Sequence, residues 1–134
     1  FLSLLTVIVQ CVQKFGLENE LSKKAKNLSG GMQRRLSIAM ALISEPQILF
    51  LDEPTLGLDV LARRELWSSI KSLKGKVTII LTTHYMDEVE NLSDRVGIMT
   101  KGQLTAVGTV AELTTQTGTS KLEDAFVVLS GGVL

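Results

Sequence analysis

The segment Ile48-Leu49-Phe50-Leu51-Asp52-Glu53 decides the fold of this chain, because a short apolar run ends there in two adjacent carboxylates. An unbroken apolar run of this length predicts a strand covered on both faces, as in a parallel sheet flanked by helices. The run Val77-Thr78-Ile79-Ile80-Leu81-Thr82 is apolar and β-branched, and it predicts a second buried strand. Helical patterns lie between and around these strands, so the sequence predicts an α/β architecture with a largely parallel sheet.

Two helices are predicted before the first strand. One covers about residues 2–15 and ends at Gly16. Its apolar residues recur at helical spacing and predict an amphipathic core helix: Leu2, Leu5, Val9 and Val12. After a polar stretch over 18–27, the turn at Ser29-Gly30-Gly31 opens a second helix that ends before Pro46. The residues expected on its apolar face are Met32, Leu36, Ala39 and Ile43.

The remaining elements follow the first strand. Asp59 is a natural N-cap for a helix over 60–74, which Gly75 ends. The buried stripe expected on that helix is Leu66, Ile70 and Leu73, with Trp67 beside it. A short acidic helix is expected over 85–92, and two strands over 95–100 and 103–107 are joined by a turn at Lys101-Gly102. Two more helices are expected, over 110–117 and 122–129.

Composition excludes several classes of function. The chain has 134 residues, enough for one domain, and its 14 basic and 14 acidic side chains give zero formal charge. Without a basic excess, neither nucleic acid nor an anionic membrane surface is expected as a partner. The basic cluster is interpreted as a solvated helical surface: Lys23, Lys24, Lys26, Arg34 and Arg35.

Cysteine and histidine are too few for a disulfide framework or a zinc site. Cys11 is the single cysteine and His84 the single histidine. A free thiol fits a reducing, cytoplasmic compartment. The apolar segment over 1–12 is shorter than the roughly 20 residues of a spanning helix, and it lacks the flanks of a signal peptide.

Three features of the sequence indicate phosphate chemistry, and each has a structural alternative. Asp52 and Glu53, at the carboxyl end of a buried strand, could hold magnesium and orient a water molecule, or they could be two acids in a solvated turn. The glycines after Ser29 allow a ligand to approach free N–H groups at a helix start, although Ser29 could simply cap the helix. His84 could donate to a phosphate or be an exposed loop histidine.

Taken together and in order, these segments resemble the ATP-binding cassette (ABC) ATPase family. Leu28-Ser29-Gly30-Gly31-Met32-Gln33 resembles its signature motif, and the segment over 48–53 resembles its Walker B strand with the catalytic glutamate. Gly57-Leu58-Asp59 resembles its D-loop, and His84 resembles its switch histidine. The resemblance covers nearly the whole chain.

The resemblance implies ATP and Mg²⁺ as cofactors and assigns a role to each matching residue. Asp52 would organise the metal, and Glu53 and His84 would be the catalytic residues. The residues that would contact nucleotide or the partner domain are Ser29, Gly30, Gly31, Gln33 and Asp59. The implied partners are a transmembrane transporter subunit and a second ABC ATPase domain, paired head to tail. The implied location is cytoplasmic and peripheral, on the inner face of the cell membrane.

A loop that grips nucleotide phosphates is missing from the sequence. It needs Gly-x-x-x-x-Gly-Lys-Ser/Thr, and the only Gly-Lys pair, Gly75-Lys76, is followed by Val77, with Ile70 at the place of the first glycine. By resemblance the chain is the C-terminal portion of one ABC domain, part of a P-loop NTPase core. Residues 1–45 would belong to the helical subdomain, 46–109 to the catalytic core, and 110–134 to a helical tail. We expect exposed sheet edges and apolar faces, and no activity from this chain alone.

Three functions remain open. The segment over 82–90 resembles the transporter form of the family, and Met32-Gln33-Arg34-Arg35-Leu36 resembles the exporter branch that moves drugs, lipids or polysaccharides. The tail over 122–126 is similar to the usual ending of that branch. The alternatives are a soluble ABC ATPase acting on DNA, ribosomes or cluster assembly, and a truncated, non-catalytic interaction module.

Overall fold

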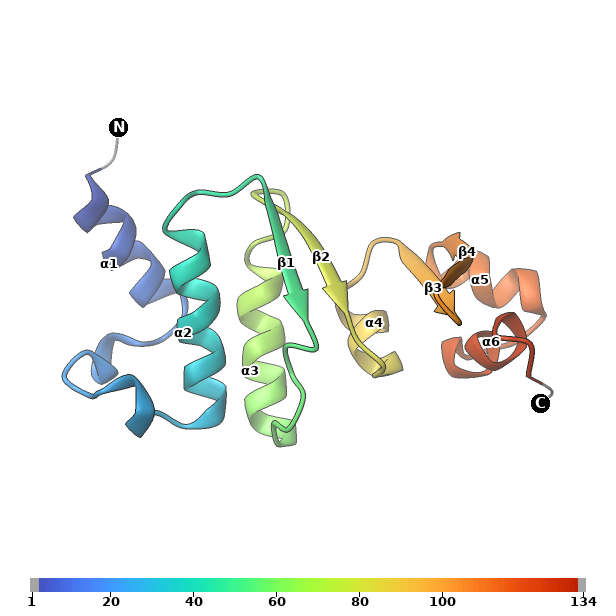
Figure 1. Cartoon of the computed structure of the whole chain (residues 1–134), viewed down its shortest axis with the longest axis horizontal. Coiled ribbons are helices and arrows are strands. Elements are labelled where there is room, and N and C mark those ends of the chain that lie inside the picture. Colours follow the sequence, from blue (N-terminus) through green and yellow to red (C-terminus); the bar gives the residue numbers. More distant parts are fainter. Residues whose placement is uncertain (1–2, 133–134) are drawn as a thin grey trace. The chain divides into compact units, whose positions relative to one another are not determined.

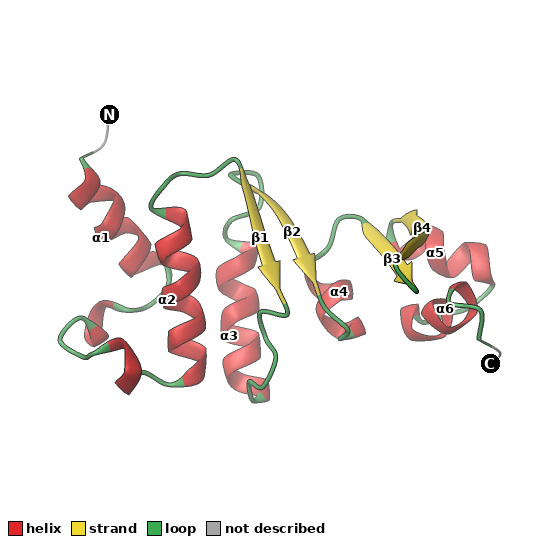
Figure 2. Ribbon diagram, in the orientation of Figure 1, coloured by secondary structure: helices red, strands yellow, loops and turns green. Residues whose placement is uncertain are grey.

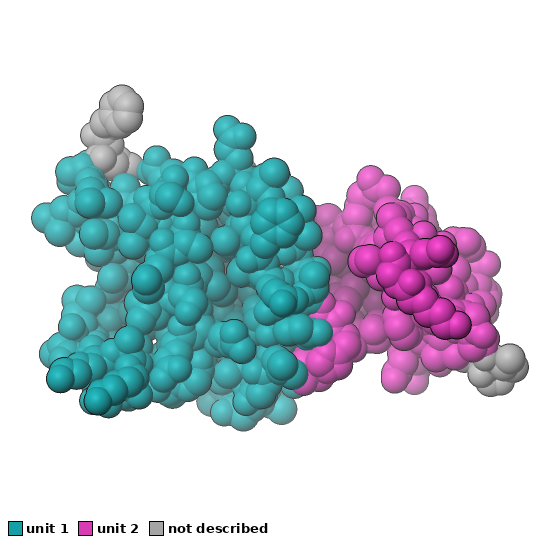
Figure 3. All heavy atoms as spheres, viewed as in Figure 1, with its two compact units in different colours: residues 1–82 teal, residues 83–134 magenta. Residues whose placement is uncertain are grey.

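The computed structural model describes residues 3–132, which form helices and strands in the predicted order (Figures 1 and 2). The elements are α1 (Leu4–Lys14), α2 (Gly30–Leu42), β1 (Ile48–Asp52), α3 (Val60–Lys71), β2 (Thr78–Thr82), α4 (Met86–Leu92), β3 (Val96–Thr100), β4 (Gln103–Gly108), α5 (Val110–Thr117) and α6 (Leu122–Leu129). Two short 3-10 helices, Glu18–Glu20 and Ala25–Asn27, lie in the polar stretch between α1 and α2. The chain divides into two compact units, residues 1–82 and 83–134 (Figure 3).

In the first unit, β1 and β2 form the predicted parallel pair. Their register runs from Ile48 opposite Thr78 to Asp52 opposite Thr82, so both strands end at the same edge. Helices α2 and α3 pack against each other, and α1 packs against α2. The stripe predicted for α3 is confirmed, since Leu66, Ile70 and Leu73 are at most 2% exposed. The helix itself ends at Lys71, three residues before the predicted bound, and Gly75 turns the chain back with φ +77°.

The prediction that both strands are covered on two faces is wrong. Burial alternates along β1: Leu49 and Leu51 are buried, whereas Ile48 is 52% and Phe50 71% exposed. On β2, Ile80 is 44% exposed. Within residues 3–132, protein atoms thus cover one face of β1 and leave the other open. The exposed apolar face expected above is present.

The prediction of a core helix near the N-terminus is also wrong. Helix α1 has no buried residue, and Leu5 and Val9 of the predicted stripe are 70% and 46% exposed. Leu2 lies outside the described residues. Val12 is the one described member of the predicted stripe that is half-buried. The other half-buried residues of the helix are Thr6, Val7, Cys11 and Lys14, and the burial is concentrated just after it, at Phe15 and Leu17. Helix α1 packs against α2, and the spacing of leucine and valine alone does not identify the covered side.

Helix α2 is likewise buried along a line displaced from the predicted one. Gly31, Ile38 and Ala39 are its buried residues, while Met32, Leu36 and Ile43 are half-buried. Ala39 is the one member of the predicted face that is fully buried.

The second unit is built on an antiparallel hairpin, a sheet separate from the parallel pair. Strands β3 and β4 are joined at Lys101 and Gly102, which both have positive φ, as tight hairpin turns require. The core of this unit contains Val96, Ile98, Leu113 and Leu122. The helices α5 and α6 have the predicted bounds, and α5 begins with a capping box between Thr109 and Glu112.

Candidate nucleotide site

The two predicted acids lie at the carboxyl edge of the parallel pair. Asp52 is the last residue of β1, opposite Thr82 in β2. The Thr82 hydroxyl donates a short hydrogen bond to Asp52 Oδ1, and the Glu53 N–H donates to the Thr82 carbonyl at 2.9 Å. Two neighbouring strands therefore hold the Asp52-Glu53 pair at the edge where open α/β sheets bind their ligands.

The backbone turns sharply at Glu53. Its φ is +44°, in the left-handed region that is costly for a residue with a side chain. The Glu53 carbonyl accepts from the Leu56 N–H at 3.1 Å, which closes a tight turn, and Pro54 and Thr55 are buried beneath it. The side chain of Glu53 is half-buried and that of Asp52 exposed, so the turn gives the two carboxylates different surroundings.

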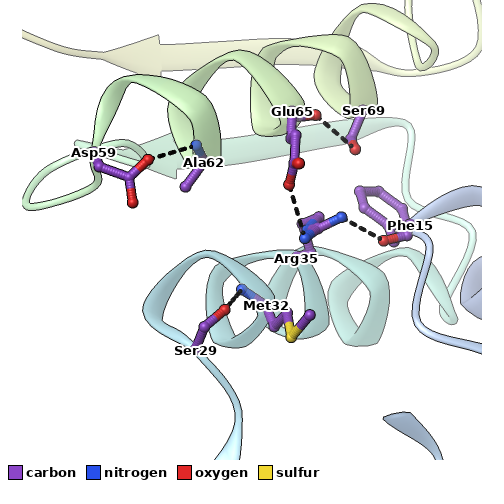
Figure 4. Close-up of polar contacts among 8 residues, drawn as sticks. All are labelled: Phe15, Ser29, Met32, Arg35, Asp59, Ala62, Glu65 and Ser69. Carbon is purple, nitrogen blue, oxygen red and sulfur yellow. Dashed lines mark hydrogen bonds and ion pairs between the residues drawn. The ribbon is translucent and has the colours of Figure 1, made fainter. Parts of the chain in front are cut away.

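Ser29 and the glycines lie at the start of α2. The Ser29 hydroxyl accepts from the Met32 N–H at 3.3 Å (Figure 4), so here it caps the helix. The Gln33 side chain folds back and donates to the Leu28 carbonyl at 3.0 Å. Ser29 and Gly30 are exposed. The positive end of the α2 dipole is therefore open to solvent, where an anion can approach it.

The start of α3 lies beside the start of α2. Asp59 caps α3 as predicted, since its Oδ1 accepts from the Ala62 N–H at 2.9 Å (Figure 4). An added Cβ on Gly31 would lie 3.2 Å from Ala62 Cβ, and one on Gly30 would lie 3.6 Å from Leu58 Cδ2. The predicted signature segment and the predicted D-loop are thus in direct contact within one unit.

These contacts separate the roles of the two glycines. Gly31 is buried, and a Cβ there would make a tight 3.2 Å contact with Ala62 Cβ, so helix packing favours glycine at this position. Gly30 is exposed and meets only an ordinary contact distance, so packing does not require it. The sequence pattern alone does not distinguish the two glycines, because the neighbour across the helix pair is remote in sequence.

His84 belongs to the second unit. It is exposed, and its ring lies 4.1 Å from that of Tyr85, centroid to centroid, with the planes tilted by 37°. The Tyr85 N–H donates to the Thr83 hydroxyl at 3.1 Å, which shapes the turn before α4. The predicted phosphate contact of His84 stays a prediction.

The donor set suits magnesium better than a softer metal. Asp52 offers carboxylate oxygens, which Mg²⁺ prefers, and in nucleotide sites this ion commonly takes one or two carboxylates together with phosphates and water. Among residues 3–132, no cluster of three or more His, Cys, Asp or Glu side chains could hold a metal. A magnesium ion at Asp52 would therefore take most of its ligands from nucleotide and water.

Thr82 is the residue of this site that the sequence analysis missed. Its hydroxyl donates a hydrogen bond to Asp52, and its carbonyl accepts from the Glu53 N–H at the turn. The sequence offered a partial signal: the two predicted strands bring Asp52 and Thr82 to the same edge of a parallel sheet, whereas the register that places them opposite each other comes from the structure.

Comparison with known proteins agrees with this arrangement. The fold is that of an ABC ATP-binding subunit: a solved structure described as the ATP binding subunit of an ABC transporter superposes with a TM-score of 0.78 at 31% identity, covering 95% of this chain and 54% of that one. The family model described as ABC transporter matches residues 6–56. No helix within residues 3–132 has the length and apolar character needed to cross a membrane.

Curated relatives extend the match beyond those residues. The daunorubicin resistance ATP-binding protein DrrA3 of Streptomyces coeruleorubidus is 43% identical over 115 residues, 85% of this chain. The phospholipid-transporting ATPase ABCA3 of Homo sapiens is 46% identical over 101 residues, 75% of this chain. This chain belongs to the ABC transporter ATPase family. It spans 36% of the first relative's length and 6% of the second's.

Proposed function

We propose that this chain is the hydrolytic portion of the ATP-binding subunit of an ABC exporter, and that it works with a phosphate-gripping segment that its own sequence lacks. The observation that carries the proposal is the Asp52-Glu53 pair, held at the carboxyl edge of β1 by Thr82. Asp52 would bind magnesium, whose chemistry is to neutralise charge on the phosphates. Glu53 would orient or deprotonate the attacking water.

The start of α2 would bind the terminal phosphate of a nucleotide held by a second ABC domain. Its Ser29 and Gly30 are exposed at a helix N-terminus, and the next residue, Gly31, is buried against Ala62 of α3. Gln33, tied to the Leu28 carbonyl, would steady the turn before the helix. His84 would contact the terminal phosphate bound by its own chain.

A surface beside this helix start suits the second domain. Leu56, Val60 and Leu61 are 48%, 66% and 69% exposed, and they flank the exposed Asp59 that caps α3. Exposed apolar side chains next to polar ones are typical of protein interfaces. We infer that Asp59 and these neighbours contact the second ABC domain in a head-to-tail pair.

We propose the exporter branch because of the names of two similar proteins. A drug-resistance protein and a phospholipid-transporting ATPase are both similar to this chain. The proposal therefore includes a transmembrane subunit as partner, a drug or lipid as cargo, and a place on the inner face of the cell membrane.

The test is ATP turnover by the full-length protein that contains this chain. Glu53→Gln should lower turnover by about 10²- to 10⁴-fold, the usual contribution of a general base. Glu45→Gln is the matched control, because Glu45 also has positive φ (48°) and is exposed before β1. Normal turnover by Glu53→Gln would refute the assignment.

A second measurement tests the proposal that this chain alone cannot bind nucleotide tightly, because its sequence has no phosphate-binding loop. Isothermal titration of the 134-residue chain with Mg²⁺ and ATP should show no nanomolar or low-micromolar binding, since the sequence has no phosphate loop. Tight binding by this chain alone would contradict the proposal that a segment outside this sequence binds the nucleotide phosphates.

A further inference from the structure

Arg35 joins three helices of the first unit through its side chain (Figure 4). Its Nη1 donates to the Phe15 carbonyl at 3.3 Å, just after α1. Its Nη2 lies 3.1 Å from Glu65 Oε2 on α3. The basic cluster was interpreted as solvated, and for Arg35 that interpretation is wrong: its side chain is only 16% exposed.

The backbone makes a left-handed turn close to this guanidinium. Gly16 adopts φ +62°, and a Cβ added there would come 3.5 Å from Arg35 Nη1. The left-handed turn carries the chain past the guanidinium, and the Phe15 carbonyl accepts the hydrogen bond from Arg35 Nη1. Phe15 is 1% exposed, so the acceptor belongs to a buried residue of the unit.

The Arg35–Glu65 ion pair lies one helical turn beyond the Gly31–Ala62 contact. Arg35 follows Gly31 by four residues on α2, and Glu65 follows Ala62 by three on α3, so both pairs face the same seam. The first contact is steric and the second is ionic. Together they clamp α2 to α3 over successive turns.

We propose that Arg35 is a positioning residue, which fixes the spacing between the start of α2 and the start of α3. These starts carry Ser29 and Asp59, so the inference rests on the proposed function for its catalytic consequence. A phosphate that draws Ser29 toward it then moves the Asp59 cap with it, because the two helices shift as one body.

The neighbouring Arg34 provides a matched control. It is the same residue type on the same helix, and it is exposed. A general effect of losing a positive charge from α2 appears in both variants, and an effect of the clamp appears only in the Arg35 variant.

The first experiment measures the helix spacing in the 134-residue chain and needs no ATP. Spin labels at the exposed Ser37 on α2 and Ser68 on α3, in a Cys11→Ser background, report the distance distribution by pulsed electron resonance. We expect a narrow distribution for the parent and a broader or shifted one for Arg35→Ala. Arg34→Ala should match the parent.

Two further variants test the chemistry of the clamp. Glu65→Gln removes the ion pair at a side chain that is 48% exposed, so it tests the spacing even where Arg35→Ala fails to fold. Arg35→Glu combined with Glu65→Arg restores opposite charges, and the distribution should narrow again. An unchanged distribution in both Glu65→Gln and Arg35→Ala would overturn the proposal, as would equal broadening by Arg34→Ala.

The second experiment separates positioning from folding in the full-length protein. Arg35→Ala should lower kcat by about 10- to 100-fold, the effect of misplacing a reacting group by about 1 Å, while KM for ATP stays near the parent value. A broadened spacing with unchanged kcat would overturn the positioning role. Normal turnover by Glu53→Gln would instead overturn the proposed function and leave the spacing result standing.

Discussion

The contact between Gly31 and Ala62 makes a quantitative prediction about the seam between α2 and α3. In Gly31→Ala, the new Cβ would lie 3.2 Å from Ala62 Cβ, closer than the roughly 3.5–4.0 Å of a favourable carbon contact. Ala62 has no side-chain torsion that could move its methyl group away. Relief of the contact therefore needs α2 and α3 to shift by a few tenths of an ångström, and where they resist, overpacking of this kind costs about 1–3 kcal/mol.

A double substitution isolates this steric term from helix propensity. Replacing glycine by alanine in a helix gains about 0.5–1 kcal/mol, so Gly31→Ala alone should lie between neutral and about 2.5 kcal/mol destabilising. Ala62→Gly alone should cost about 1 kcal/mol. In the double variant the clash is gone and the propensity terms nearly cancel, so the pair should be about 1–3 kcal/mol more stable than the sum of the singles.

Urea unfolding followed by Trp67 fluorescence measures these free energies, because the single tryptophan lies on α3 in the same unit. Gly30→Ala is the matched control: its Cβ would meet Leu58 Cδ2 at an ordinary 3.6 Å, so its effect should add to that of Ala62→Gly. If the effects of Gly31→Ala and Ala62→Gly also add to within about 0.5 kcal/mol, the steric account of Gly31 is refuted.

Three further predictions concern other parts of the chain. Asp59→Ala removes the cap of α3 and should lower the unfolding free energy by about 0.5–2 kcal/mol in the same fluorescence assay, and no change would argue against the cap. Hydrogen bonds from Thr109 lower the pKa of Glu112 from near 4.5, so the stability this carboxylate gives α5 is present above that pH and lost as pH falls through the lower folded pKa. Amide exchange of α5 should show that loss, and Glu112→Gln should abolish its pH dependence; an identical pH profile in the variant would contradict it. Phe50 is 71% exposed, so Phe50→Lys should reduce self-association in sedimentation velocity without lowering the unfolding midpoint, whereas unchanged association would locate the contact elsewhere.

Features set by nearby residues could be predicted from the sequence. The Asp59 cap depends on an N–H three residues away, and the buried stripe of α3 depends on spacing within one helix. Both predictions are confirmed. The bounds of α5 and α6 are confirmed for the same reason, since capping and turn residues delimit them.

Features set by distant partners could not be predicted. An apolar run such as that of β1 shows that a strand can be buried on both faces, but the number of covered faces depends on which other elements pack there. The face that α1 turns inward depends on α2, and the close approach at Gly31 depends on Ala62. Arg35 was misread for the same reason, because its partners lie 20 and 30 residues away along the chain.

The acids of the site were found from sequence, and their geometric support was not. Asp52 and Glu53 are recognisable by following an apolar strand. The hydrogen bond from Thr82 requires the strand register, which single-strand patterns do not give. The proposed roles of Ser29, Gly30 and His84 remain predictions.

The left-handed backbone at Glu53 has a consequence for directed evolution. Glycine adopts this conformation without steric cost, and relief of such strain is worth about 1 kcal/mol or more. A library of variants sorted for thermal resistance should therefore enrich Glu53→Gly. If Glu53 has the proposed catalytic role, a library of the full-length protein sorted for ATP turnover should discard the same variant, because it loses the carboxylate. At position 53, selection for stability would therefore favour glycine, whereas selection for activity would favour glutamate.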